Sequence, residues 1–161
     1  MAYHQFVFLI LWAGACGYAA WRGGAPERIA AAAILLAATG TRWADELVAP
    51  YESVVGGVLL IDLVLLGILL WLALASTRFW PMLMTSMHMC GLLGHLSKPL
   101  GPEIIPKAYY ASVAFWGFPV VLLLAVATWR HRRRLARYGV DYAWTRDLPD
   151  SYRAGGSARP K

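Results

Sequence analysis

Long apolar runs separated by short polar segments dominate the pattern of this chain, at residues 6–21, 29–39, 54–76, 79–96 and 108–129. A hydrocarbon core about 30 Å thick needs roughly 20 apolar helical residues to cross it. The Ala-rich run 29–39 is short, but a helix that starts at Glu27 and continues to about Val48 has the necessary length. The pattern therefore predicts an all-α membrane protein, a bundle of about five transmembrane helices.

The second run leaves an alternative open. As an interfacial or re-entrant segment, 29–39 would leave four spans and place the N-terminus inside, where residues 1–5 have no Lys or Arg to hold it. Its alanines favour a helix buried among others, because small side chains let neighbouring backbones approach closely. We therefore predict a transmembrane domain of residues 1–134, with spans near 6–21, 27–48, 54–76, 79–96 and 108–129.

The basic residues predict the orientation, because Lys- and Arg-rich flanks stay on the cytoplasmic side. In a five-span arrangement that side receives Arg22, Arg28 and Arg78 together with the basic run after the last span, and the opposite side receives Arg42, Lys98 and Lys107. This asymmetry predicts an N-terminus outside and a cytoplasmic C-terminus. In the basic run, the topology anchor and contact with anionic lipid headgroups is assigned to Arg130, Arg132, Arg133 and Arg134.

Residues 135–161 are predicted to form a cytoplasmic tail that is partly interfacial and then disordered, since its end offers no apolar face to bury.

Composition agrees with a membrane location, because 59% of the residues are hydrophobic and only 15% are charged, unlike an ordinary soluble domain. The net charge of +6 is concentrated after the last span, so we predict an anionic leaflet rather than nucleic acid as its partner. A multi-pass protein of the plasma membrane, in bacteria the inner membrane, is expected.

Two ionisable residues inside the apolar runs are the first candidates for function, because such groups are costly in a bilayer. Asp62 lies eight residues from the start of the third run, and His88 lies eight residues from the end of the fourth. At 1.5 Å per residue both are about 12 Å below the same surface. Runs three and four are joined by a short turn, so we predict neighbouring antiparallel helices and an intramembrane polar pair of Asp62 and His88.

Other polar side chains extend this candidate site. His95 follows His88 by seven residues and so returns to nearly the same helical face, beside Met84. His4 and His95 lie at the same predicted level on different helices, an arrangement that suits axial haem ligation. Structural hydrogen bonding, a proton path, and a metal, copper or haem site all remain open for these histidines. We predict no bound cofactor and keep haem and copper as alternatives. The identity of any bound metal is unknown.

High-specificity catalytic, nucleotide-binding or metal-binding motifs are not found in the sequence. The first hypothesis is therefore a non-enzymatic structural or accessory component of a membrane complex, bound to another integral membrane protein or to copies of itself. The alternatives are a proton- or metal-handling membrane protein that uses Asp62, His88 and His95, and a haem-binding electron carrier. We expect that the protein is not an enzyme.

Overall fold

The structure, a computed structural model, describes the backbone of residues 2–47, 53–100 and 106–149 and the side chains of residues 6–43, 56–93 and 115–149. Its helices are α1 (Ala2–Arg22), α2 (Ala25–Leu47), α3 (Ser53–Ala75), α4 (Trp80–Leu100) and α5 (Pro106–Tyr138), followed by a short 3₁₀ helix, Thr145–Asp147. The prediction of an all-α chain with five long helices is confirmed for the described residues.

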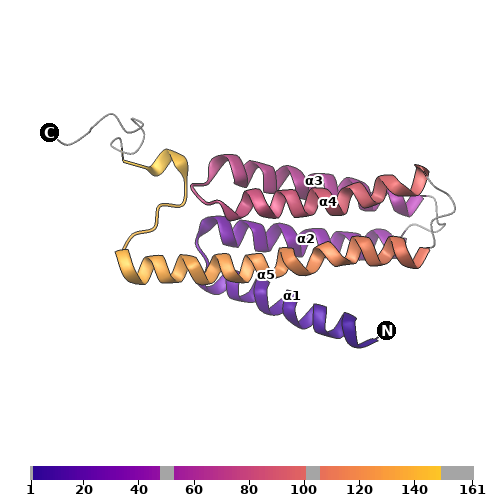
Figure 1. Ribbon diagram of the computed structural model, residues 1–161, viewed down its shortest axis with the longest axis horizontal. Helices are drawn as coiled ribbons and strands as arrows, with labels where there is room; N and C mark the ends of the chain where they lie inside the picture. The colour runs from indigo at the N-terminus through magenta and orange to yellow at the C-terminus, as the bar shows by residue number, and fades with distance from the viewer. Residues whose placement is uncertain (1, 48–52, 101–105, 150–161) are drawn as a thin grey trace.

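The five helices form an antiparallel bundle in which each helix packs against the next one in the chain (Figure 1). α5 returns to pack against α1, which closes the ring, and it also contacts α2. The two described turns, between α1 and α2 and between α3 and α4, lie at the same end as the C-terminal half of α5 (Figure 1). This end therefore gathers three chain segments that are far apart in the sequence.

Glycine permits two of the changes in chain direction at this end. At Gly23, a Cβ atom would collide with the Ala19 carbonyl oxygen and would lie 2.7 Å from the Glu27 Cβ, so only glycine fits between α1 and α2. Gly139 has a φ of +72°, and its N–H donates to the Leu135 carbonyl at 2.9 Å. A left-handed residue of this kind commonly ends a helix, and it stops α5 here and reverses the chain.

The buried core is built largely from small side chains in α1 and α2 and from leucines in the other helices. Ala19, Ala30 and Ala31 are fully buried, as are Leu69 and Leu124. Alanine on α2 lets neighbouring backbones approach closely. This accounts for the contact of α2 with three of the other helices, α1, α3 and α5.

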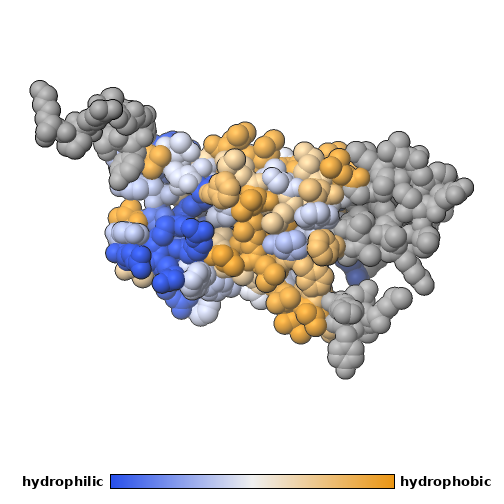
Figure 2. All heavy atoms as spheres, viewed as in Figure 1, coloured by the Kyte–Doolittle hydropathy of each residue, from blue (hydrophilic) through white to orange (hydrophobic). Residues whose placement is uncertain are grey.

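Large apolar side chains also cover much of the outer surface of the bundle, and polar residues gather at the end where α5 terminates (Figure 2). Among the described residues, one helical segment is both long and apolar enough to cross a membrane, Gly56–Ala75, with a mean hydropathy of 2.8. Only 11% of the most apolar 18 residues of this segment are buried inside the structure. The apolar stretch Phe6–Arg22 is shorter.

The chain after the last predicted span is more ordered than the sequence indicated. α5 continues to Tyr138, because Leu, Ala and Arg are good helix formers and a helix does not end where its apolar run ends. Residues 140–147, called the docked segment below, then pack back against the turn between α3 and α4 (Figure 1). The predicted disorder of the chain end falls largely on residues 150–161, which lie outside the described residues.

Candidate functional site

A buried group of polar side chains occupies the end of the bundle where α5 terminates. Its residues come from the first turn of α2, the turn between α3 and α4, the start of α4, α5 and the docked segment. We call it the polar cluster, and its members are Glu27, Arg78, Trp80, His131, Arg134 and Asp141. Glu27, Arg78 and His131 are buried, which is unusual for ionisable residues unless they are paired.

The docked segment brings Asp141 into the cluster, and hydrogen bonds to the α3–α4 turn hold it there. The Thr77 hydroxyl donates to the Tyr142 carbonyl at 2.7 Å, and the Thr145 hydroxyl donates to the Ala75 carbonyl at 3.0 Å. The second bond satisfies one of the carbonyls left unpaired at the end of α3. The Trp144 ring adds a contact with Trp71, with ring centroids 5.5 Å apart.

The Asp141 carboxylate is the centre of the cluster. Its Oδ2 atom lies 2.7 Å from Arg78 Nη1 and 2.7 Å from His131 Nδ1, and its Oδ1 atom accepts a 3.0 Å hydrogen bond from Arg134 Nε. A carboxylate can only accept, so His131 Nδ1 donates in this short contact. The same atom therefore cannot accept from Arg78 Nη2, which lies 3.4 Å away and can only donate. Asp141 therefore joins two residues of α5, His131 and Arg134, to Arg78 in the α3–α4 turn.

Glu27 lies on the other side of Arg78, ahead of the apolar run of α2 and within the polar end of the molecule. Its Oε1 atom accepts a 3.1 Å hydrogen bond from Trp80 Nε1 and lies 4.0 Å from Arg78 Nη1. Its second oxygen, Oε2, is buried without a hydrogen-bond partner among the described residues.

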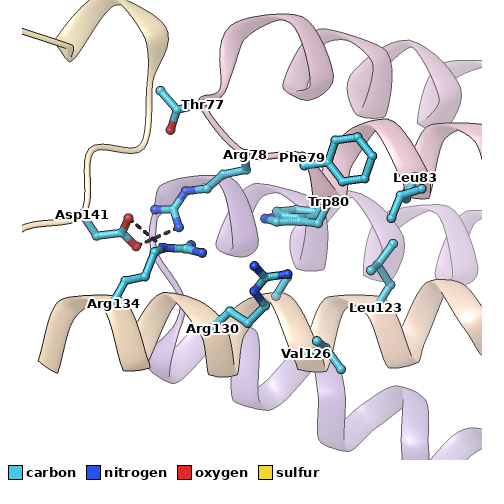
Figure 3. Close-up of a pocket in the computed structure, with 11 residues that line it drawn as sticks. Thr77, Arg78, Phe79, Trp80, Leu83, Leu123, Val126, Arg130, Arg134 and Asp141 are labelled. Atoms are coloured by element: carbon cyan, nitrogen blue, oxygen red, sulfur yellow. Dashed lines mark hydrogen bonds and ion pairs between the residues drawn. The ribbon is translucent and has the colours of Figure 1, made fainter. Parts of the chain in front are cut away.

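A pocket of about 370 Å³ opens beside the polar cluster, between α4 and α5 (Figure 3). Three arginines and Asp141 line one side of it, and apolar side chains line the other. Figure 3 shows the guanidinium groups of Arg78, Arg134 and Arg130 on the first side, with Leu83 and Leu123 opposite. The pocket thus combines a cationic wall with an apolar one, a combination that suits an amphiphilic anion.

The predicted pair of Asp62 and His88 lies in a second cavity, of about 200 Å³, inside the bundle. Residues of all five helices line it, Asp62 and His88 among them. His88 Nε2 donates to the backbone carbonyl of Asp62 at 3.0 Å, so the contact that joins these two residues involves the peptide group of α3. The structure therefore brings the two residues together at one depth, with the imidazole on a carbonyl oxygen.

The remaining predicted residues are distributed differently. Met84 is fully buried in the core and is not among the residues that line this cavity. His4 and His95 belong to α1 and α4, but their side chains lie outside the described ones, so the predicted haem pair and the His95 relay stay predictions. Within the described residues no group of three His, Cys, Asp or Glu side chains is placed to hold a metal ion.

The four arginines predicted to anchor the chain all lie on α5 beyond Trp129, with different environments. Arg130, Arg132 and Arg133 are exposed, and the guanidinium of Arg133 stacks over the Trp129 ring at 4.8 Å. Arg134 is two-thirds buried through its bond to Asp141. Arg130 lines the pocket and Arg134 belongs both to the pocket and to the polar cluster, so two of these residues have a specific local role.

Sequence reasoning missed the polar cluster as a site. In the sequence, Glu27 marks the start of the predicted second span, Arg78 serves as a topology signal, and Asp141 falls in the predicted tail. A signal for the cluster was present, because the α1–α2 turn, the α3–α4 turn and the end of the last span are predicted to lie on one side, where each carries ionisable residues. Comparison with protein-family models, curated proteins and solved structures finds no match for this chain.

Proposed function

We propose that this chain is a multi-pass integral membrane protein of the plasma membrane with a non-enzymatic, structural or accessory role. The membrane location is supported by the composition and exposure of α3. Its segment Gly56–Ala75 has a mean hydropathy of 2.8, and only 11% of its most apolar 18 residues are buried inside the structure. A core helix of a soluble protein with this composition would be covered by its own chain. A helix so apolar and so little covered needs lipid or another membrane helix around it.

The lengths of the other helices support crossing as well. Each of the five has at least 21 residues, which at 1.5 Å per residue gives about 30 Å, the thickness of a hydrocarbon core. The polar cluster and the exposed Arg130, Arg132 and Arg133 lie together at one end of the bundle. The excess of basic residues at this end supports a cytoplasmic position for it and an external N-terminus.

The accessory role is supported by the outer face of α1. At Gly14 and Gly17 a Cβ atom would meet nothing within 4 Å, and Ala13 and Ala20 on the same face are exposed. In a membrane, small residues spaced in this way allow a second helix to approach closely and pack. α1 therefore offers a contact face for another integral membrane protein or for a second copy of the chain.

The size of the complex in mild detergent tests this role. The wild-type protein, solubilised from its own membranes and separated under native conditions, should run above the size of one chain. Gly17→Leu, which blocks the α1 face, should reduce that size. Gly67→Leu is the matched control, because Gly67 on α3 is exposed and equally open, with nothing within 4 Å of its Cβ position. Equal sizes for the two variants would contradict a role for α1 in assembly.

A second function, proton handling inside the bundle, is favoured by the cavity that Asp62 and His88 share. An imidazole can titrate near neutral pH and pass a proton, whereas a glutamine at the same position cannot. Proteoliposomes that contain a pH-sensitive dye and hold the purified chain test it. Proton flux that His88→Gln abolishes would support this function, and flux no faster than in empty liposomes would contradict it.

A further inference from the structure

The pocket between α4 and α5 has more positive charge on its wall than the protein neutralises. Arg78, Arg130 and Arg134 line it together with a single acid, Asp141. Both oxygens of Asp141 are already engaged, Oδ1 by Arg134 and Oδ2 by Arg78 and His131. Glu27 does not line the pocket but lies 4.0 Å from Arg78 Nη1, so the three arginines of the wall face two carboxylates and keep an excess of positive charge.

Hydrogen-bond donors on this wall lack acceptors. The side chain of Arg78 is only 4% exposed, yet its Nε atom is buried without a hydrogen-bond partner among the described residues. The Nη2 atom of Arg134 is also buried without a hydrogen-bond partner among the described residues. Buried donors without acceptors are uncommon in folded proteins, because each loses its bond to water and gains none. An oxyanion bound in the pocket would offer acceptors to these atoms, and Arg130, which also lines the pocket, would add a third cation.

The opposite wall of the pocket is apolar and continues onto the outer surface of the bundle. Leu83 and Leu123 form it together with Phe79 and Val126 (Figure 3). Phe79 is 67% exposed and Val126 is 47% exposed, so this wall reaches the surface that the proposed bilayer covers. A small soluble anion would fill the cationic side and leave this wall bare.

We propose that this pocket binds an anionic phospholipid, with its phosphate on Arg78, Arg130 and Arg134 and an acyl chain along Leu83 and Val126. This inference rests on the proposed membrane location and adds to it a defined site for a single lipid. A site of this kind differs from general attraction to an anionic leaflet, because it depends on which arginine is removed and not only on how many. Arginine suits the role, since its planar group binds phosphate oxygens in pairs.

Native mass spectrometry of the full chain in a zwitterionic detergent tests the site. The protein is titrated with phosphatidylglycerol, with phosphatidylcholine and with inorganic phosphate in separate series. We expect phosphatidylglycerol to bind at least about tenfold more tightly than phosphatidylcholine, because the wall offers charge-assisted bonds to an anion. Inorganic phosphate at the same concentrations should not displace the lipid, because it lacks an acyl chain for the apolar wall.

Two variants with matched controls separate the pocket from its surroundings. Arg130→Gln removes an exposed arginine that lines the pocket and should weaken phosphatidylglycerol binding about tenfold. Arg137→Gln removes the same charge from the same helix outside the pocket, so binding should change less than about twofold. Val126→Trp should also weaken binding by filling the groove, whereas Leu122→Trp, on an exposed position outside the pocket, should not.

The contrary results are distinct. Equal losses for Arg130→Gln and Arg137→Gln would overturn the site and leave only general electrostatic attraction. Displacement of the lipid by inorganic phosphate would overturn the lipid as the ligand and assign the wall to a soluble phosphate. A chain that inserts into membranes but shows no preference for phosphatidylglycerol would refute this inference alone. A chain recovered in the soluble fraction without detergent would refute the proposed membrane location as well.

Discussion

Replacing Asp141 with Asn should destabilise the protein far more than its place near the chain end indicates. The substitution keeps the shape of the side chain and removes the charge that faces Arg78 at 2.7 Å. Arg78 is 4% exposed, so water replaces the lost partner only poorly while the docked segment stays in position. Breaking a buried ion pair by removing one partner costs about 3 to 5 kcal/mol.

Two features of the cluster place the expected loss at the lower end of that range. Glu27 Oε1 lies 4.0 Å from Arg78 Nη1 and retains part of the attraction. The bond from Arg134 adds little to the loss, because its side chain is 33% exposed and water screens the interaction. We therefore expect about 3 kcal/mol for Asp141→Asn, which for a chain of this size lowers the melting temperature by about 6 to 12 °C.

Thermal unfolding of the detergent-solubilised protein measures this loss, and Asp147→Asn is the matched control. Asp147 lies near Asp141 in the chain, but its contact with Arg146, at 3.6 Å, is exposed and should contribute about 0 to 1 kcal/mol. Trypsin should also cleave after Arg146 faster in Asp141→Asn, because the docked segment is released more often. Equal melting temperatures and cleavage rates for the two variants would refute the buried ion cluster as a source of stability.

Two further predictions concern the close approach of α1 to α2 and the cavity histidine. Gly23→Ala should destabilise the protein by about 1 to 3 kcal/mol in the same assay, because its Cβ meets the Ala19 carbonyl oxygen and the Glu27 Cβ. The control Gly67→Ala, with open space around it, should be neutral or slightly stabilising. A tolerated Gly23→Ala would contradict the observed turn. His88→Gln should leave the melting temperature nearly unchanged, since an amide can donate to the Asp62 carbonyl. His88→Leu, which cannot donate, should lower the stability by about 1 kcal/mol. A loss of stability in the Gln variant as large as in the Leu variant would show that the ring itself is needed.

The helices were predictable because their apolar runs are long and the polar segments between them are short. The turn at Thr77 and Arg78 leaves room only for neighbouring antiparallel helices, so the common depth of Asp62 and His88 also followed from counting residues. The end of α5 was not predictable in this way. An apolar run that stops at Trp129 shows where the apolar surface of the helix stops, and the helix continues through Arg residues that themselves favour helix.

The specific pairings within the polar cluster could not be derived from the sequence, for a related reason. Glu27, Arg78 and Asp141 each lie beside a turn or in a tail, where an ionisable residue is usually solvated. Their pairing depends on ring closure between α1 and α5 and on the chain reversal at Gly139, and both are long-range features. The acceptor that His88 uses is likewise set by the rotation of α3 and α4 about their axes, which residue spacing fixes only approximately.

Labelling of single cysteines in sealed, right-side-out membrane vesicles tests the proposed membrane topology most directly. Cysteines introduced at Gly101 and Lys161, in a chain whose own Cys16 and Cys90 are replaced by Ser, are exposed to a membrane-impermeant maleimide. We expect the cysteine at position 101 to be labelled in intact vesicles and the one at position 161 to be labelled only after the vesicles are opened. Labelling of both positions from the same side, or loss of the protein from the membranes on alkaline washing, would contradict a five-span bundle with its arginine-rich end in the cytoplasm.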